Sequence, residues 1–214
     1  MQTNKNTYLY STLALVTIII TFVVNNSLIT IDTYYNTFQA QLESSRIDEI
    51  FDFQLKYNWI GYILIPFWIL LKNTIVAVCL IIGLHLNDLK LRFEKIFTVV
   101  LTADFVFLLP QLIKLWWFLV FKTDFTLLEF NQFYPLSALN LFKIENLSAL
   151  LIYPFQTFSV FEILYWLLLA GGIKQALDSD INQGIKVVFS GYIPALALWI
   201  LCVMFITVSL GSAT

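Results

Sequence analysis

Residues 158–172 read FSVFEILYWLLLAGG, an apolar stretch interrupted by one carboxylate, that of Glu162. A helix needs about 20 mostly apolar residues to cross a bilayer, and the apolar sequence around this stretch extends from 147 to 173. The stretch therefore predicts a membrane-spanning helix with an acidic side chain near its middle. A charge at such a position is costly in hydrocarbon, so it requires a structural or a functional explanation.

The whole chain has the composition of an integral membrane protein. Of its 214 residues, 59% are hydrophobic and only 12% are charged, whereas soluble domains carry about 25% charged residues. The net charge of -2 offers no basic surface for nucleic acid. Cys79 and Cys202 both lie in apolar runs, so we expect neither a disulfide framework nor a metal site. We also expect no cofactor.

Five segments are long and apolar enough to span a membrane as helices. The predicted spans are approximately 8–29, 58–84, 96–121, 147–173 and 185–210. The first is followed by VVNNSLITID, which lacks the small-residue cleavage site of a signal peptide, so we expect this span to be retained. No internal repeat or low-complexity linker divides the chain. The predicted fold is therefore all-α, a single polytopic transmembrane bundle of five helices over residues 1–214.

The basic residues predict that the N-terminus lies inside and the C-terminus outside. Cytoplasmic segments carry an excess of Lys and Arg, and this orientation places more basic residues in the short inner segments than in the two longer outer loops. The inner residues are Lys5, Lys90, Arg92, Lys95, Lys174 and Lys186, and the outer ones are Arg46, Lys56, Lys122 and Lys143. We expect the cell inner membrane as the location.

The first outer loop carries apolar residues at near-helical spacing between residues 38 and 55, with acidic residues largely on another side. This pattern predicts an amphipathic helix lying at the outer membrane interface. Such a helix could pack on the outer ends of the bundle or form a docking face for a partner. The apolar residues are Phe38, Leu42, Ile47, Ile50, Phe51 and Leu55.

Three ionisable residues lie deep in the predicted spans: Lys72, Asp104 and Glu162. Each isolated central charge costs about 2.5–3.5 kcal/mol, so we expect these residues to face one another and not lipid. Opposite charges in a low dielectric stabilise each other's ionised form. This rule predicts a pair between Lys72 and Glu162, with Asp104 nearby or protonated. Gln111 follows Asp104 at a helical spacing and is expected on the same helix face.

Three roles are open for this predicted polar network. It could join the helices, it could form a path for ions or protons, or it could contact a span of another subunit. Prolines in or at the start of four spans predict kinked helices, and glycines predict a close approach of the last two spans. The prolines are Pro66, Pro110, Pro154 and Pro194. The glycines are Gly171, Gly172, Gly184 and Gly191.

The sequence lacks the motifs of intramembrane enzymes. One histidine, His85, cannot supply the histidine pair of an H-E-x-x-H metalloprotease. Neither a G-x-S-x-G nucleophile motif nor a P-loop occurs in the chain. We therefore expect a protein that is not an enzyme.

Two parts of the chain resemble the bacterial branch of the Yip1-like superfamily. They are LNDLKLRFEKIFTVVLTADFVFLLP, and FSVFEILYWLLLAGGI followed by DSDINQGIKVVFSGYIPALALW. The resemblance covers residues from about 58 to 210, although Gly171 comes later than the family's glycine and the outer loop after the first span is longer. It implies five spans, an inner N-terminus, an outer C-terminus and a membrane-organising or trafficking scaffold without a catalytic site.

These features together predict a non-enzymatic integral inner-membrane protein that is a scaffold or accessory subunit of a membrane transport or secretion complex. The alternative is a small transporter or ion-conducting protein with a buried Lys/Asp/Glu polar core. The expected partners are membrane lipid and other membrane protein subunits or a second copy of the chain. We expect no nucleic acid.

Overall fold

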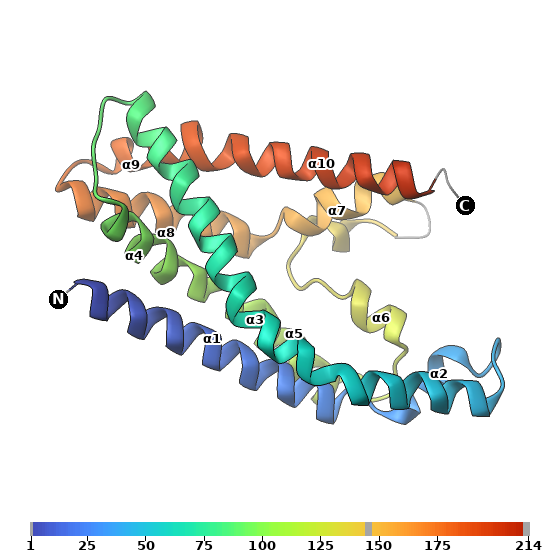
Figure 1. Ribbon diagram of the computed structural model, residues 1–214. Helices are drawn as coiled ribbons and strands as arrows, with labels where there is room; N and C mark the ends of the chain where they lie inside the picture. Colours follow the sequence, from blue (N-terminus) through green and yellow to red (C-terminus); the bar gives the residue numbers. More distant parts are fainter. Residues whose placement is uncertain (1, 144–146, 212–214) are drawn as a thin grey trace. The chain divides into compact units, whose positions relative to one another are not determined.

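The computed structural model describes residues 2–143 and 147–211, and their regular structure is almost entirely helical. The helices are α1 (Gln2–Ser27), α2 (Ile31–Phe38), α3 (Ser44–Leu86), α4 (Phe93–Asp104), α5 (Leu108–Val120), α6 (Leu127–Gln132), α7 (Ala149–Thr157), α8 (Val160–Leu177), α9 (Ile181–Val187) and α10 (Ile193–Gly211) (Figure 1). Between them lie two 3-10 segments, η1 (Phe105–Phe107) and η2 (Ala138–Leu141), and a π-helical segment, η4 (Val188–Tyr192).

Five helical stretches are long and apolar enough to cross a membrane. They are Asn4–Ser27, Ser44–Leu86, Phe93–Val120, Val160–Leu177 and Ile181–Ser209. The prediction of an all-helical fold with five such stretches is therefore confirmed for the described residues, and it indicates a membrane-embedded protein. The orientation of the termini and the identity of the membrane stay predictions.

The chain forms two compact units. The first unit comprises Met1–Tyr10, Leu71–Phe107 and Tyr134–Thr214, and the second comprises Ser11–Leu70 and Leu108–Phe133. Helices α1 and α3 each contribute residues to both units. This division does not test the prediction of one membrane domain over the whole chain, which stays a prediction.

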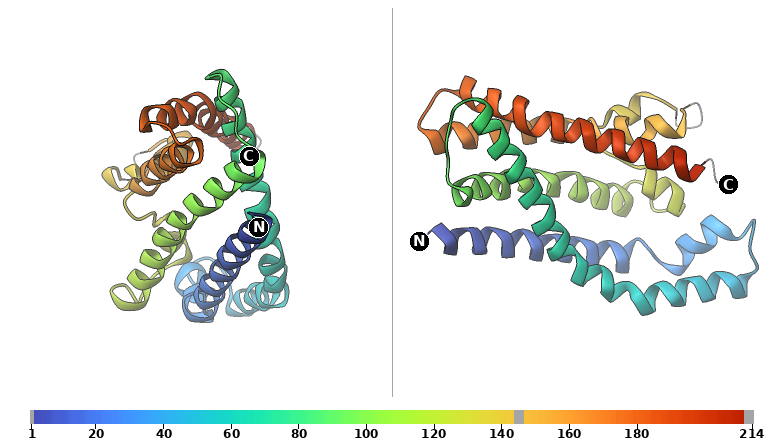
Figure 2. Two further views of the ribbon diagram at one scale, coloured as in Figure 1. Left: turned by 90° about the vertical axis from the view of Figure 1, so that its left-hand side faces the viewer. Right: turned by 45° about the horizontal axis from the view of Figure 1, so that its top comes forward.

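In the first unit, α8 packs against α9 and α4, and it runs antiparallel to the line formed by α9 and α10 (Figures 1 and 2). Two glycines permit these contacts. A Cβ atom at Gly184 would overlap the carbonyl oxygen of Ala170 on α8, and one at Gly172 would overlap the side chain of Val99 on α4. The surrounding apolar core includes the buried side chains of Leu80, Ile96, Leu101, Leu169 and Ile173.

The π-helical segment η4 packs against α3 through another pair of glycines. A Cβ atom added to Gly83 would overlap the carbonyl oxygen of Val187 and would lie 3.0 Å from the Cα atom of Gly191. Next to this contact, Asn87 Nδ2 donates a hydrogen bond of 2.9 Å to Ser190 Oγ. Gly191 therefore lies in the contact between η4 and α3. The sequence had predicted that it would lie in a contact between the fourth and fifth spans.

The second unit has an aromatic core. Its buried residues are Leu28, Phe118, Phe125 and Phe130. The centroid of the Phe118 ring lies 4.5 Å from that of Phe125 and 5.1 Å from that of Phe130. Phe125 and Phe130 come from the loop after the third span, so its aromatic residues belong to this core.

The predicted amphipathic helix over residues 38–55 is not one helix. Helix α2 ends at Phe38, and α3 begins at Ser44 after a turn and continues to Leu86. The turn lets α2 fold back on the start of α3, where the Tyr34 ring lies 5.3 Å from the Phe51 ring. This packing buries Ile47 to 1% exposure.

The apolar residues predicted to form one face of this segment therefore differ in exposure. Ile47 is buried, Phe38, Ile50 and Phe51 are half-buried, and Leu42 and Leu55 are exposed. A location at the membrane interface, or a docking role, stays a prediction.

The predicted fourth span, 147–173, is also broken. Phe158 and Ser159 separate α7 from α8 and have extended backbone conformations. The reason is a short antiparallel pairing with the loop before η2: the Ala138 N–H donates to the Phe158 carbonyl at 2.8 Å, and the Val160 N–H donates to the Leu136 carbonyl at 3.1 Å. The apolar helix that could cross a membrane here begins at Val160.

Two of the prolines follow irregular helical segments. Pro110 lies in the first turn of α5, which follows η1, and Pro194 lies in the first turn of α10, which follows η4. A proline ring clashes with the carbonyl of the residue four positions earlier, and in these two cases that residue lies in the 3-10 or π-helical segment. By contrast, Pro66 lies inside the uninterrupted helix α3.

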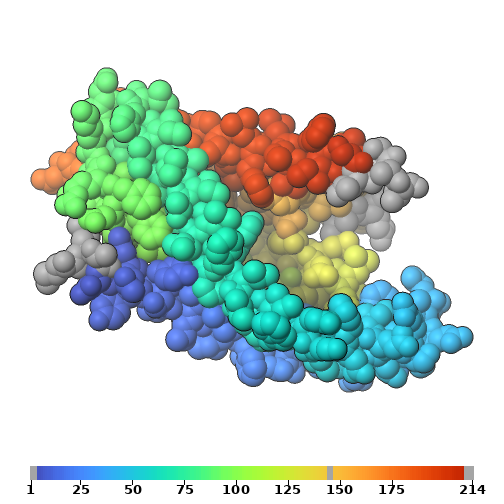
Figure 3. All heavy atoms as spheres, in the orientation of Figure 1, coloured from blue at the N-terminus to red at the C-terminus, as the bar shows by residue number. Residues whose placement is uncertain are grey.

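Side chains of α3 form part of the surface shown in Figure 3. The exposed large apolar side chains of this helix include Trp59, Ile63, Phe67 and Trp68. In water such a surface would favour aggregation, whereas in a membrane it is the expected contact with lipid.

Candidate functional site

Asp104 belongs to a buried group of polar side chains in the first unit. It is the last residue of α4, and its side chain is 3% exposed. Lys72 Nζ lies 2.5 Å from Asp104 Oδ1, and Asn73 Nδ2 donates to Asp104 Oδ2 at 2.9 Å. Lys72 and Asn73 are consecutive residues of α3. Two neighbouring side chains of one helix therefore hold both carboxylate oxygens of another.

The burial of Asp104 explains why it requires a cation. A buried carboxylate is costly unless it is paired and hydrogen-bonded. The Lys72 ammonium group supplies the opposite charge, and it also lies 5.0 Å from the centre of the Phe107 ring. The Lys72 side chain is 37% exposed, so the anion of this pair is enclosed whereas the cation is partly accessible.

Glu162 lies in the first turn of α8, where the helix end carries a partial positive charge. Ser159 is the N-cap, and its Oγ accepts a hydrogen bond of 3.2 Å from the backbone N–H of Glu162. Glu162 Oε1 accepts hydrogen bonds from Trp166 Nε1 at 2.7 Å and from the Tyr192 hydroxyl at 2.8 Å. A helix N-terminus favours a nearby carboxylate, so this acidic group is supported by neutral donors and a helix end.

Aromatic rings connect the two carboxylates. The Phe107 ring lies 4.9 Å from the Tyr165 ring, which lies 5.4 Å from the Tyr192 ring. Tyr165 is 1% exposed, and its hydroxyl has no hydrogen-bond partner among the described residues. We refer to the following residues as the polar cluster: Lys72, Asn73, Asp104, Glu162, Tyr165, Trp166 and Tyr192.

The polar cluster differs from the predicted network in its pairing. The predicted Lys72–Glu162 pair is wrong, because the lysine is bonded to Asp104. The start of α8 contributes to this choice, because a helix N-terminus supports the Glu162 carboxylate without a bonded cation. Gln111 lies on α5 in the second unit. The 3-10 segment η1 separates it from Asp104, so the regular spacing of one helix face does not connect these two residues.

Sequence reasoning missed Asn73, Phe107 and Tyr192. Asn73 had a local signal, since it is a second polar residue beside Lys72 within an apolar run. Residues 159–162 also match the S-x-x-E pattern of a helix start, which could have placed Glu162 in a first turn. Tyr192 had no comparable signal, because its role depends on the contact between α8 and η4.

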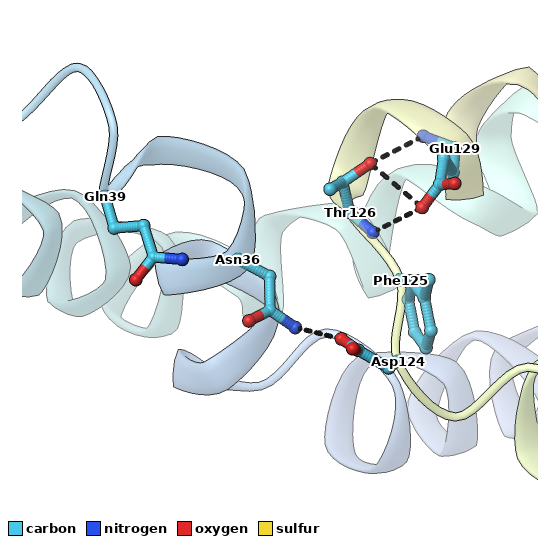
Figure 4. Close-up of a pocket in the computed structure, with 6 residues that line it drawn as sticks. All are labelled: Asn36, Gln39, Asp124, Phe125, Thr126 and Glu129. Carbon is cyan, nitrogen blue, oxygen red and sulfur yellow. Dashed lines mark hydrogen bonds between the residues drawn. The ribbon is translucent and has the colours of Figure 1, made fainter.

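A second polar feature lies in the second unit (Figure 4). A pocket of about 310 Å³ is lined by Asn36, Gln39, Asp124, Phe125, Thr126 and Glu129. Asn36 donates to Asp124 at 2.8 Å, and Thr126 and Glu129 form the capping box that starts α6. The hydrogen bond from Lys122 is the largest cause of the lowered pKa of Glu129. Because both acidic side chains are engaged by neighbouring residues, we interpret this pocket as part of the loop packing.

Comparisons with protein-family models, with curated proteins and with solved structures found no match. The resemblance to the Yip1-like superfamily therefore stays a prediction. The polar cluster contains one ammonium group, two carboxylates and two phenols, which are groups that can join helices or bind protons and small cations.

Proposed function

We propose that the chain is a non-enzymatic integral membrane protein that acts as a scaffold or accessory subunit of a membrane transport or secretion complex. The five apolar helices support the membrane location. One observation carries the structural role: both carboxylates of the polar cluster are fixed by two donors each. Asp104 is held by two side chains of α3, and Glu162 by one side chain of α8 and one of η4.

These hydrogen bonds join segments that are distant in the sequence. The pair between Lys72 and Asp104 connects α3 to α4, and the bond between Tyr192 and Glu162 connects η4 to α8. Removing one partner of a fully buried charge pair costs about 3–5 kcal/mol, and the partial exposure of Lys72 lowers that cost here. Side chains fixed in this way support a rigid helical unit on which other membrane proteins can assemble.

The proposed partners are membrane lipid and other membrane protein subunits or a second copy of the chain. Exposed apolar side chains on α10, including Leu198, Trp199 and Phe205, support contact with lipid. The distribution of basic residues favours the cell inner membrane with the N-terminus inside. The resemblance to the Yip1-like superfamily is consistent with a membrane-organising role.

Native mass spectrometry of the full chain, extracted from its native membrane in a mild detergent, tests this proposal. We expect an assembly of fixed stoichiometry that contains another membrane protein or a second copy. Recovery of the chain only as a monomer, together with solute or ion flux when it is reconstituted alone, would contradict the proposal.

A small transporter or ion-conducting protein is the second candidate. The exposure of the Lys72 side chain favours it, because a partly accessible charge could exchange its partner for a passing ion. Flux measurements in proteoliposomes distinguish the two candidates. Specific flux that is lost in a folded Lys72→Met variant would favour the transporter, and the absence of flux would favour the scaffold.

A further inference from the structure

Glu162 is an acidic group of the polar cluster to which no cation among the described residues is bonded. The ammonium group of Lys72 is bonded to Asp104 instead. The Glu162 carboxylate accepts hydrogen bonds from two neutral donors, both on Oε1. The residue is only 6% exposed.

The hydroxyl of Tyr165 adds no support for a charge on Glu162. Tyr165 follows Glu162 by three positions on α8, which places both residues on one helix face. Its hydroxyl is buried without a partner among the described residues, so it does not donate to the Glu162 carboxylate. A buried carboxylate is costly in its ionised form unless it is paired and hydrogen-bonded, and the two neutral donors to Oε1 are the support that this one has.

Few charged or titratable groups face Glu162 from the elements packed against α8. On α9, Lys186 is exposed, and on α4, Glu94 and the exposed Lys95 lie in the first turn, at the end opposite Asp104. The groups that remain are Lys72 on α3, Asp104 on α4, Tyr165 on α8 and Tyr192 on η4. Because the charges of Lys72 and Asp104 offset each other, ionised Glu162 would give the polar cluster a net negative charge.

We propose that the carboxyl group of Glu162 is a reversible proton-binding site. The bound proton makes the polar cluster neutral. The ionised form is also supported, because two donors and a helix N-terminus stabilise charge on the carboxylate, so the proton can leave. This proposal rests on the geometry of the polar cluster and not on the proposed scaffold role.

Infrared spectroscopy of the full chain in detergent tests the proposal, because a protonated carboxyl group has a C=O stretching band separate from those of carboxylates. At neutral pH we expect a band that shifts with carboxyl-13C glutamate and not with labelled aspartate. This isotope test uses the unaltered chain, so it does not depend on the folding of a variant. The band should disappear in Glu162→Gln and remain in Glu94→Gln, a control whose side chain is 42% exposed.

Two further measurements test the assignment of the band to Glu162. The band should lose its intensity in one step as the pH rises. Tyr192→Phe should move it to higher frequency, because the carboxyl group loses a hydrogen-bond donor, whereas Tyr8→Phe, at an exposed position, should leave it unchanged.

Three results would overturn the proposal. They are an unaltered chain without a glutamic-acid band, a band that Glu162→Gln leaves in place, and a band that disappears when sodium is added at constant pH. The last result would make Glu162 a site for a metal cation.

Discussion

The Ser159 hydroxyl accepts a hydrogen bond of 3.2 Å from the backbone N–H of Glu162, which places Glu162 in the first turn of α8. The charge of a helix N-terminus stabilises a carboxylate there by about 0.3–1 kcal/mol, and by up to about 2 kcal/mol in partly buried sites. The same turn lies beside the Tyr192 hydroxyl. A buried acidic residue without a bonded lysine is therefore explained by where its helix begins.

Replacing the cap residue should loosen this helix start. Ser159→Ala should reduce the free energy of unfolding by about 0.5–2 kcal/mol, because the N–H of Glu162 loses its acceptor. Ser148→Ala is the matched control, since Ser148 occupies the N-cap of α7 without a side-chain capping bond. Thermal unfolding in detergent measures both variants, and equal losses would contradict the assigned cap.

The glycine contact between α3 and η4 should not tolerate a methyl group. Gly83→Ala should destabilise the protein by about 1–3 kcal/mol, because the added Cβ overlaps backbone atoms that cannot easily move. Gly171→Ala has open space around the new Cβ, and it should be neutral or stabilise helix α8 by up to about 1 kcal/mol. Denaturation of both variants in the same detergent measures this difference. A Gly83→Ala variant as stable as Gly171→Ala would contradict the close contact.

The pairing of Glu129 with Lys122 should make the start of α6 sensitive to acid. Since the folded-state pKa of Glu129 is lowered, its stabilising contribution is complete above the unfolded-state pKa and is lost as the pH falls through the folded-state value. The effect should be small, because the Glu129 side chain is 46% exposed. Amide hydrogen exchange in α6 should rise in acid more for the unaltered chain than for Glu129→Gln. An identical pH dependence in both proteins would contradict the pairing.

The orientation predicted from the basic residues can be tested by cysteine labelling. With Cys79 and Cys202 replaced, Ser44→Cys should react with a membrane-impermeant thiol reagent from the outer side. Asn182→Cys, in the first turn of α9, should react only after the membrane is permeabilised. Labelling of the second variant alone from outside would invert the orientation.

The spans could be predicted from the sequence because their signal is local. An apolar run of sufficient length is visible in the residues themselves, and the five stretches agree in order with the predicted ones. The breaks could not be located in this way. The one at Phe158 and Ser159 depends on pairing with Leu136 and Ala138, and the one before Ser44 depends on α2 folding back on α3.

The partner of Lys72 could not be predicted because it depends on tertiary structure. Hydrophobic burial predicted that the three deep charges would meet, but it gave no reason to prefer one carboxylate over the other. The structure supplies two such reasons: Asn73 and Lys72 together hold Asp104, and Glu162 lies at a helix N-terminus. Both follow from tertiary contacts and from where α8 begins, which the apolar pattern does not show.

A double-mutant cycle between Lys72 and Asp104 tests most directly whether this pair joins α3 to α4. Lys72→Met and Asp104→Asn should each lower thermal stability in detergent, and the double variant should lose less than the sum of the two, with a coupling energy of about 0.5–3 kcal/mol. The matched cycle of Lys72→Met with Glu162→Gln should show a clearly smaller coupling. Additive losses for Lys72 and Asp104, or a larger coupling between Lys72 and Glu162, would contradict the observed pairing.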